Sequence, residues 1–276
     1  MRLPFFWSRL LSTADISESN AQFRGAWRHF AASSPRGEVA NTPEAFIANA
    51  NAPWSMLNAA FLPKPVETPE ALERSVAAAA RRLASIKAGW LYVACDHWLA
   101  PNVREAAPAI FAAHGLKRAM NTMGMVAERL LPPSRPLPFI EVRQATDEEG
   151  LRHIADINAL AYDSPLEAAR ESVMVPAMFQ GDSRGYVGYV EGKAVSVAAV
   201  LRVEGIAYVA YVATLADYRR RGYAEAVMRY GLEEARRDWG LERTVLHASD
   251  EGHPVYLRMG YRDVVNFGFY MPPGKH

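Results

Sequence analysis

The stretch TLADYRRRGYA, residues 214–224, decides the fold of the second half of this chain. The apolar run before it, residues 206–213, predicts a strand, and residues 222–239 after it place their apolar side chains on one face of a helix. Gly222 and Ala224 let the backbone approach a ligand closely, at a helix N-terminus whose free N–H groups attract anions. The three adjacent arginines add positive charge in a geometry suited to phosphate. The stretch therefore predicts an anion site, without specifying the anion.

Around this junction, strands and helices alternate through residues 139–276 in the order β-α-α-β-β-β-α-β-α-β. The segment before them, residues 131–138, holds four prolines in eight residues and predicts a linker. The predicted strands are residues 139–142, 185–190, 194–203, 206–213, 244–247 and 264–270. The first predicted helix begins at residue 146, and the other three cover residues 165–174, 222–239 and 254–259.

The first half, residues 1–130, carries a second α/β pattern. Its predicted elements are a helix that Thr68 caps and that runs to about residue 86, a strand at residues 89–94, a helix at residues 102–114 ended by Gly115, and a strand at residues 119–126. Residues 1–50 give weaker signals, from which we expect only a short helix around Trp27.

The second half resembles the GNAT superfamily of N-acetyltransferases. The acetyl-CoA signature of that family reads R/Q-x-x-G-x-G/A after a strand, as Arg219, Gly222 and Ala224 do here. Residues 246–249 followed by residues 255–261 are similar to the family's later strand and its Y-x-x-x-G-F/Y helix. The resemblance implies an α/β fold with a central mixed sheet flanked by helices.

This resemblance covers residues 139–276 and has one departure, Ala216, where many members have proline. The departure matters little, because the pyrophosphate contacts of the family are mostly made by backbone groups.

The resemblance also implies that acetyl-CoA is the cosubstrate and that its acetyl group passes to a primary amine by direct attack. Tyr256 would act as the general acid for the departing thiolate. Backbone groups of Val212 and Thr214 would hold the pantetheine arm where two strands splay, and Ser249 stands where the family often has an asparagine near the cofactor. The implied cofactor-binding residues are Val212, Thr214, Arg219, Arg220, Arg221, Gly222, Tyr223, Ala224 and Ser249.

Each of these interpretations has a structural alternative. A run of arginines before a glycine is often a solvated turn, and Tyr256 would also serve as a core aromatic residue. His247 is either a base or a structural strand residue. The strand at residues 206–213 carries no Asp or Glu, so Tyr208, Tyr211 or water would have to replace a carboxylate base.

The first half looks like a partial, degenerate copy of the second, as in tandem members of the superfamily. Residues 110–116 align with residues 255–261, and in both cases one predicted strand precedes the helix and another follows. Asn121 and Asn266 each lie six residues past the aligned glycine. The copy lacks the R-x-x-G-x-A loop and has Phe111 where the second half has its tyrosine, so we expect a structural or substrate-shaping role. A generic α/β segment is the alternative.

The composition of the chain argues against several classes of partner and site. A net charge of +1 with 22% charged residues gives no reason to expect nucleic acid or an anionic membrane as a partner. No stretch approaches the ~20 apolar residues of a membrane span, and the apolar run at residues 1–7 is broken by Ser8 and Arg9, unlike a signal peptide. The single cysteine, Cys95, excludes an internal disulfide and a multi-cysteine metal site and favours the cytoplasm. We expect it to be a buried apolar side chain rather than a nucleophile.

Two other functions stay open at this point. One is a catalytically silent acyl-CoA-binding or sensor module, which the missing strand carboxylate favours. The other is an acyltransferase that uses a longer acyl-CoA. The sequence does not specify whether the amine belongs to a small molecule, a peptide terminus or a lysine, and it leaves a homodimer open.

Overall fold

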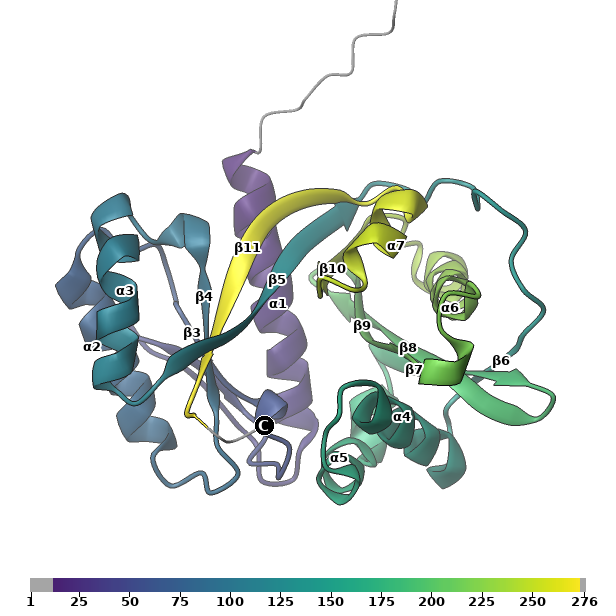
Figure 1. The fold of residues 1–276 in the computed structure, drawn as a ribbon, viewed down its shortest axis with the longest axis horizontal. Coiled ribbons are helices and arrows are strands. Elements are labelled where there is room, and N and C mark those ends of the chain that lie inside the picture. The colour runs from purple at the N-terminus through teal and green to yellow at the C-terminus, as the bar shows by residue number, and fades with distance from the viewer. Residues whose placement is uncertain (1–11, 274–276) are drawn as a thin grey trace, which may run out of the picture.

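The computed structural model describes residues 12–273, so the apolar run at residues 1–7 lies outside the described range. Within that range the strands form one 11-stranded sheet in the order β1-β2-β3-β4-β11-β5-β10-β9-β8-β7-β6 (Figure 1). The strands are β1 (Glu38–Asn41), β2 (Phe46–Asn49), β3 (Asn58–Phe61), β4 (Leu91–Cys95), β5 (Lys117–Ala127), β6 (Glu141–Gln144), β7 (Ser183–Val190), β8 (Lys193–Val203), β9 (Ile206–Thr214), β10 (Thr244–Ala248) and β11 (Arg262–Met271).

Helices cover both faces of this sheet. Over residues 12–273 they are α1 (Thr13–Ser33), α2 (Pro69–Leu83), α3 (Pro101–Ala113), α4 (Glu148–Ala161), α5 (Leu166–Val173), α6 (Tyr223–Trp239) and α7 (His253–Met259). In this part of the chain no helix combines the length and apolarity needed to cross a membrane. The predicted mixed sheet flanked by helices is confirmed, and its neighbouring strands are antiparallel except for the pairs β3–β4 and β9–β10.

The last strands of the two halves are exchanged. The first-half strand β5 pairs with β10 of the second half, and the second-half strand β11 pairs with β4 of the first half. The two exchanged strands also pair with each other, and they cross at the centre of the molecule in Figure 1. Each half therefore completes its sheet with a strand from the other half.

The predicted relationship between the two halves is visible where α3 and α7 end. The N–H of Leu116 donates to the carbonyl of Phe111 at 2.9 Å, and the N–H of Tyr261 donates to the carbonyl of Tyr256 at 3.0 Å. In each case the turn contains a glycine in the left-handed region, which closes a helix without strain. Phe111 and Tyr256 thus occupy equivalent places, four residues before the glycine that closes each helix.

Most predicted elements are present, with shifted ends. Thr68 caps α2 by accepting a hydrogen bond from the N–H of Ala71, as expected, and Pro69 occupies the first turn. The first strand after the linker is displaced from residues 139–142 to Glu141–Gln144. The expectation of a short helix around Trp27 was wrong, because α1 runs over 21 residues.

The sequence does not predict the full length of α1 because polar side chains lie on the buried face of this helix. Asn20 and Gln22 are 5% and 1% exposed, and they donate to the carbonyls of Ile16 and Val203. The amide oxygen of Gln22 has no partner among the described residues, but both amide N–H groups are bonded. The two polar side chains break the apolar periodicity that would predict a long helix. In Figure 1, α1 lies behind the crossing of β5 and β11, and it contacts strands of both halves.

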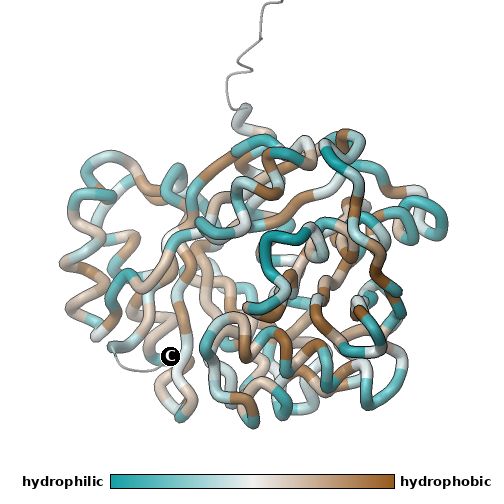
Figure 2. The backbone as a smooth tube through the Cα atoms, turned by 45° about the vertical axis from the view of Figure 1, so that its right-hand side comes forward, coloured by the Kyte–Doolittle hydropathy of each residue, from teal (hydrophilic) through white to brown (hydrophobic). Residues whose placement is uncertain are grey.

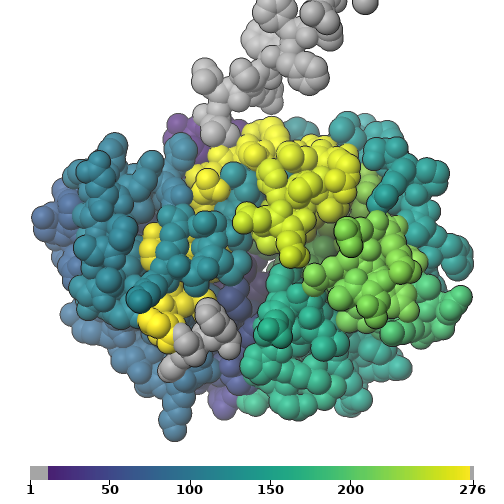
Figure 3. Space-filling view, in the orientation of Figure 1, coloured from purple at the N-terminus to yellow at the C-terminus, as the bar shows by residue number. Residues whose placement is uncertain are grey.

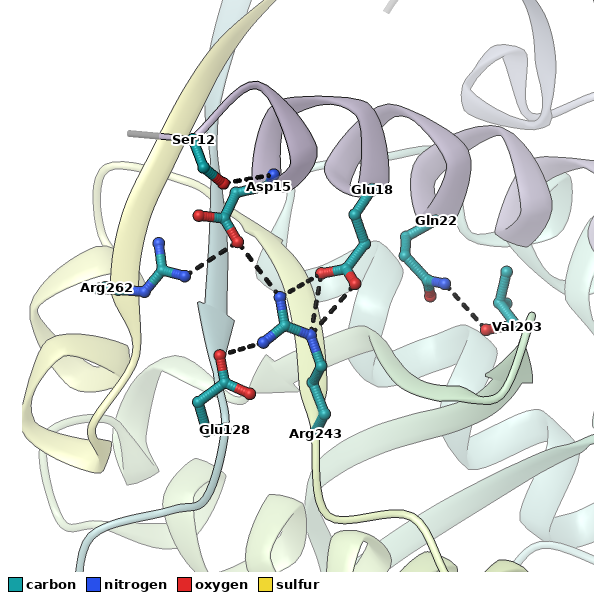
Figure 4. Close-up of polar contacts among 8 residues, drawn as sticks. All are labelled: Ser12, Asp15, Glu18, Gln22, Glu128, Val203, Arg243 and Arg262. Carbon is teal, nitrogen blue, oxygen red and sulfur yellow. Dashed lines mark hydrogen bonds and ion pairs between the residues drawn. The ribbon is translucent and has the colours of Figure 1, made fainter. Parts of the chain in front are cut away.

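A cluster of ion pairs joins the first turns of α1 to the second half (Figure 4). Arg243, just before β10, bonds to Glu18 at 2.6 Å and to Asp15 at 3.3 Å, and it also pairs with Glu128 after β5. Arg262 donates to the same carboxylate of Asp15 at 3.0 Å. Burial on its own raises the pKa of Asp15, but the bonds from Arg262 and Ser12 and the nearby arginines hold that pKa below its ordinary value. The cluster fixes α1 across the boundary between the halves.

The core is continuous through both halves. Figure 2 shows tan and brown colours along the inner strands and alternating teal and brown along the outer helices. One cluster of buried residues includes side chains of the helices from α1 through α5 and of strands in both halves. A second cluster lies between the sheet and the helices α6 and α7. The Cys95 side chain is 2% exposed in β4, and burial raises the pKa of its thiol. Apolar packing rather than the linker therefore sets how the halves lie against each other.

Candidate active site

A gap opens between two parallel strands of the second half. Strands β9 and β10 pair only from Ala207 to Val209, and beyond this point they separate. Tyr211 has φ +52°, and the register between β8 and β9 shifts beside it, which marks a bulge. A non-glycine residue rarely adopts this conformation, and such positions cluster at functional sites. The bulge turns the backbone of residues 211–212 away from the strand ladder, at the place where the sequence predicted a splay.

The carbonyl of Val212 lies at this gap. The phenol of Tyr162, which follows α4, donates a hydrogen bond to it at 3.0 Å. A carbonyl oxygen has two lone pairs, so it keeps the capacity to accept from a ligand amide. Thr214, at the end of β9, is held through its hydroxyl by Ser196 at 2.8 Å. Both predicted pantetheine contacts are therefore on an anchored segment of backbone.

The predicted anion loop begins α6. Arg220 and Gly222 have φ +61° and +92°, both in the left-handed region, so the chain turns sharply on both sides of Arg221 before it enters α6. Gly222 is the N-cap of α6 and supplies no side chain, which leaves the first N–H groups of that helix for a ligand. A Cβ on Gly222 would lie 3.1 Å from Cδ of Pro138. Only glycine fits this position, because it tolerates both the conformation and the contact.

The arginines around this loop have different surroundings. The guanidinium of Arg219 donates to the carbonyls of Thr214 and Ala161, at 3.2 Å and 2.8 Å, and so ties the loop to the end of α4. Arg221 lies over the ring of Tyr218. Arg135, from the proline-rich segment, has its Nη2 atom 3.7 Å from where a Cβ of Gly222 would be. The linker thus adds a further guanidinium to the loop, which the sequence did not indicate.

A cleft of about 350 Å³ connects the strand gap to the first half. Val212, Ser249 and Tyr256 line it together with residues of α1, β5 and β11. In Figure 3 a hollow is visible between the yellow atoms of the α7 region and the teal-green atoms of α4. Three of the predicted site residues therefore meet in one cleft, with the arginine loop beside it.

Tyr256 comes from α7 and is 8% exposed. Its ring lies against Gly252, where an added Cβ would be 3.3 Å from the phenol oxygen, and Ser249 caps the same turn through its carbonyl. Burial, with a smaller contribution from Tyr162, raises the pKa of Tyr256 above its ordinary value of 10. The phenol therefore holds its proton at neutral pH, as a general acid must before the leaving group departs.

His247 is fully engaged with protein groups. Its Nδ1 and Nε2 atoms lie 3.0 Å from the Tyr208 phenol and 3.2 Å from the Ser19 hydroxyl, and its ring stacks on Phe23 at 3.7 Å. Burial lowers the pKa of His247 to about 3. A neutral imidazole with both nitrogens in hydrogen bonds favours the structural interpretation over the base.

Sequence reasoning missed the contribution of the first half to this cleft. The cleft is lined by Phe23 and Trp27 of α1, Trp54 and Met56 between β2 and β3, Met120 of β5 and Phe269 of β11. Sequence reasoning also missed Tyr162 and Arg135. These residues form no motif, because they are separated widely in sequence, and only their aromatic character gave a signal.

The site thus combines a splayed parallel strand pair, a bulge and a glycine loop at the start of the next helix. Residues 151–261 match the model of the acetyltransferase (GNAT) family. The match to the GNAT family thus lies within the second half of this chain. No curated protein matches the sequence of the chain.

Solved structures extend the likeness to the whole chain. A GCN5-related N-acetyltransferase from Kribbella flavida is 18% identical, with a TM-score of 0.66 over 94% of this chain and 96% of that one. A GCN5-related N-acetyltransferase-like protein from Streptococcus suis is 13% identical, with a TM-score of 0.52 over 94% and 99%. A tandem GNAT protein from the clavulanic acid biosynthesis pathway is 13% identical, with a TM-score of 0.52 over 92% and 94%. At these identities the likeness concerns the fold, which is that of a tandem GNAT protein.

Proposed function

We propose that this protein is an N-acetyltransferase that moves the acetyl group of acetyl-CoA to a primary amine. The observation that carries the proposal is the meeting of the Val212 backbone and the Tyr256 phenol in one cleft, beside the glycine loop of α6. The loop N–H groups and the arginines would hold the pyrophosphate, and the gap between β9 and β10 would admit the thioester. The match to the GNAT family supports the same cosubstrate.

The proposed step is direct acyl transfer. The neutral amine nitrogen attacks the thioester carbonyl carbon and forms the C–N bond, and the C–S bond breaks as the tetrahedral adduct collapses. Tyr256 gives its proton to the departing sulfur, and the proton lost by the amine passes to water. Tyr208 is an unfavourable base, because its phenol is already bonded to His247 at 3.0 Å.

The alternative of a silent acyl-CoA-binding module rests on one observation. Strand β9, Ile206–Thr214, carries no carboxylate that could act as a base. A third function, an acyltransferase that uses a longer acyl-CoA, would be recognised by faster turnover of a longer acyl-CoA than of acetyl-CoA.

Thermal unfolding with and without acetyl-CoA, followed by thiol release with a panel of amines, tests the proposal. We expect acetyl-CoA at about 100 times its Kd to add ~2.7 kcal/mol to the free energy of unfolding. Stabilisation without thiol release from any amine would support the silent module. Absence of stabilisation would contradict both functions.

A further inference from the structure

We propose that the acceptor is a monoamine whose amino group is carried on an aromatic or other bulky apolar body without a carboxylate. This inference rests on the proposed function and concerns the end of the cleft formed by α1, β5, β11 and the residues between β2 and β3. That end is lined by Phe23, Trp27, Trp54, Met56, Met120 and Phe269, a set we call the aromatic wall.

The aromatic wall is a packed surface. Phe23 makes edge contacts with Trp27 at 4.7 Å and lies 5.9 Å from Phe269, measured between ring centroids. The indole N–H of Trp27 is already bonded to the carbonyl of Met56 at 2.9 Å, so it offers no donor to a ligand. Apart from the indole N–H of Trp54, the wall therefore presents carbon and sulfur, which bind apolar groups and reject hydrated ones.

The charge of the cleft lining also favours a monoamine without a carboxylate. Among the described residues that line it, Asp163 is the only one with a formal charge, and His247 is neutral. No lysine or arginine of this lining is available to pair with a carboxylate, so an amino acid would be bound with its carboxylate unpaired, which is costly. One carboxylate attracts a single ammonium group and gives a polyamine no second partner.

A polar group lies between the wall and the strand gap. Thr122 of β5 is 7% exposed, lines the cleft, and its Oγ1 has no hydrogen-bond partner among residues 12–273. A buried hydroxyl without a partner is unusual and indicates a missing ligand group. Its neighbour Met123 pairs with Ala248, the last residue of β10, so Thr122 lies where β9 and β10 have separated. We therefore infer that the Thr122 hydroxyl accepts a hydrogen bond from the amine nitrogen of the acceptor and holds that nitrogen near the thioester.

The test uses four amines with acetyl-CoA: 2-phenylethylamine, ethanolamine, phenylalanine and putrescine. We expect kcat/KM for 2-phenylethylamine to exceed that for ethanolamine by about 10- to 100-fold, the effect of burying one phenyl ring. Phenylalanine, with the same ring and an added carboxylate, is expected to be at least ~10-fold poorer than 2-phenylethylamine.

Three variants locate the effect. Met56→Gln and Met120→Gln keep side-chain length and add a polar amide, and each is expected to lower kcat/KM for 2-phenylethylamine by about 3- to 10-fold while leaving ethanolamine unchanged. Met174→Gln is the matched control, because Met174 is half-buried outside this cleft. Thr122→Val keeps the shape and removes the hydroxyl, so it is expected to raise KM for both amines alike.

Calorimetric titration of each amine into the protein, with and without CoA, separates this inference from the proposed function. Acetyl-CoA turnover that favours ethanolamine, phenylalanine or putrescine would overturn the inference and keep the acetyltransferase. Binding of 2-phenylethylamine without any binding of CoA would keep the apolar amine site and overturn the acetyltransferase. Binding of neither compound would overturn both.

Discussion

Thr122 of β5 pairs directly with Phe267 of β11, and the two residues hold equivalent places in the two halves. Each lies seven residues after the glycine that closes its preceding helix, Gly115 or Gly260. An approximate twofold axis therefore passes between them, and the exchange of β5 and β11 follows from it. The strand that carries Thr122 is also the one that pairs with β10 and so completes the sheet of the second half.

The first prediction concerns the independence of the halves. A fragment of residues 137–276 leaves β10 without β5 and β11 without both of its partners, so we expect it to be insoluble or to unfold without a cooperative transition. The measurement is thermal unfolding by circular dichroism. In contrast, a full chain cleaved at a protease site inserted after Ser134 is expected to elute as one particle. A fragment that melts cooperatively and binds acetyl-CoA would contradict this.

The second prediction concerns the anion loop. Gly222→Glu places bulk and negative charge where the pyrophosphate would bind, so stabilisation by acetyl-CoA is expected to disappear in a thermal-shift assay. Gly205→Glu is the matched control, since Gly205 also has a positive φ, +78°, but has open space around it in the β8–β9 turn. Equal stabilisation by acetyl-CoA in both variants would remove the site assignment.

The third prediction concerns the general acid. Tyr256→Phe keeps the ring and removes the proton, so we expect unchanged acetyl-CoA binding and a fall in kcat of about 10- to 1,000-fold. Tyr261→Phe is the control. The ring centroid of Tyr261 lies 5.9 Å from that of Tyr256, and its buried phenol is hydrogen-bonded to Thr244 rather than to a group of the cleft. Full activity in Tyr256→Phe would leave the tyrosine a positioning role. The reverse change, Phe111→Tyr, is expected to destabilise the fold, because Phe111 is 0% exposed and stacks on Tyr270 at 3.5 Å.

The fourth prediction concerns pH. The folded-state pKa of His247, about 3, lies below the unfolded value of 6.5, so the unfolded chain takes up its proton first. Stability from this residue is therefore complete above about pH 6.5 and is lost as the pH falls towards 3, by at most ~1.4 kcal/mol per pH unit. His247→Gln does not titrate, so its urea-unfolding free energy is expected to fall less than that of the wild type between pH 7 and pH 5. Parallel losses would refute a buried neutral histidine.

The fifth prediction concerns the ion cluster that fixes α1. Arg243→Ala leaves Asp15, Glu18 and Glu128 without their shared partner, and we expect a loss of about 2 kcal/mol in the free energy of unfolding. Arg236→Ala is the control, since its guanidinium bonds Glu233 on the same exposed helix face, and we expect it to cost under ~0.5 kcal/mol. Urea denaturation at low salt measures both, and equal effects would show that the cluster does not join the halves.

Much of the second half follows from its sequence. The glycine loop, the helix it opens and the tyrosine helix were predicted because they depend on local chemistry, such as the left-handed conformation of Gly222 and the closing turn at Gly260. The match between residues 110–116 and residues 255–261 was visible for the same reason. These features need only the residues beside them.

Tertiary structure alone decided which strands pair and what the cleft contains. Strands β5 and β11 have similar patterns, and nothing local tells whether each completes its own sheet or that of the other half. That choice depends on the fit of the whole core, including α1 and the pairing of Thr122 with Phe267. The aromatic wall is decided in the same way, because the burial of Phe23 beside His247 depends on contacts across more than 200 residues of chain. The sequence thus accounts for the glycine loop of this protein, and the exchange of strands accounts for the residues of the first half that line the cleft beside it.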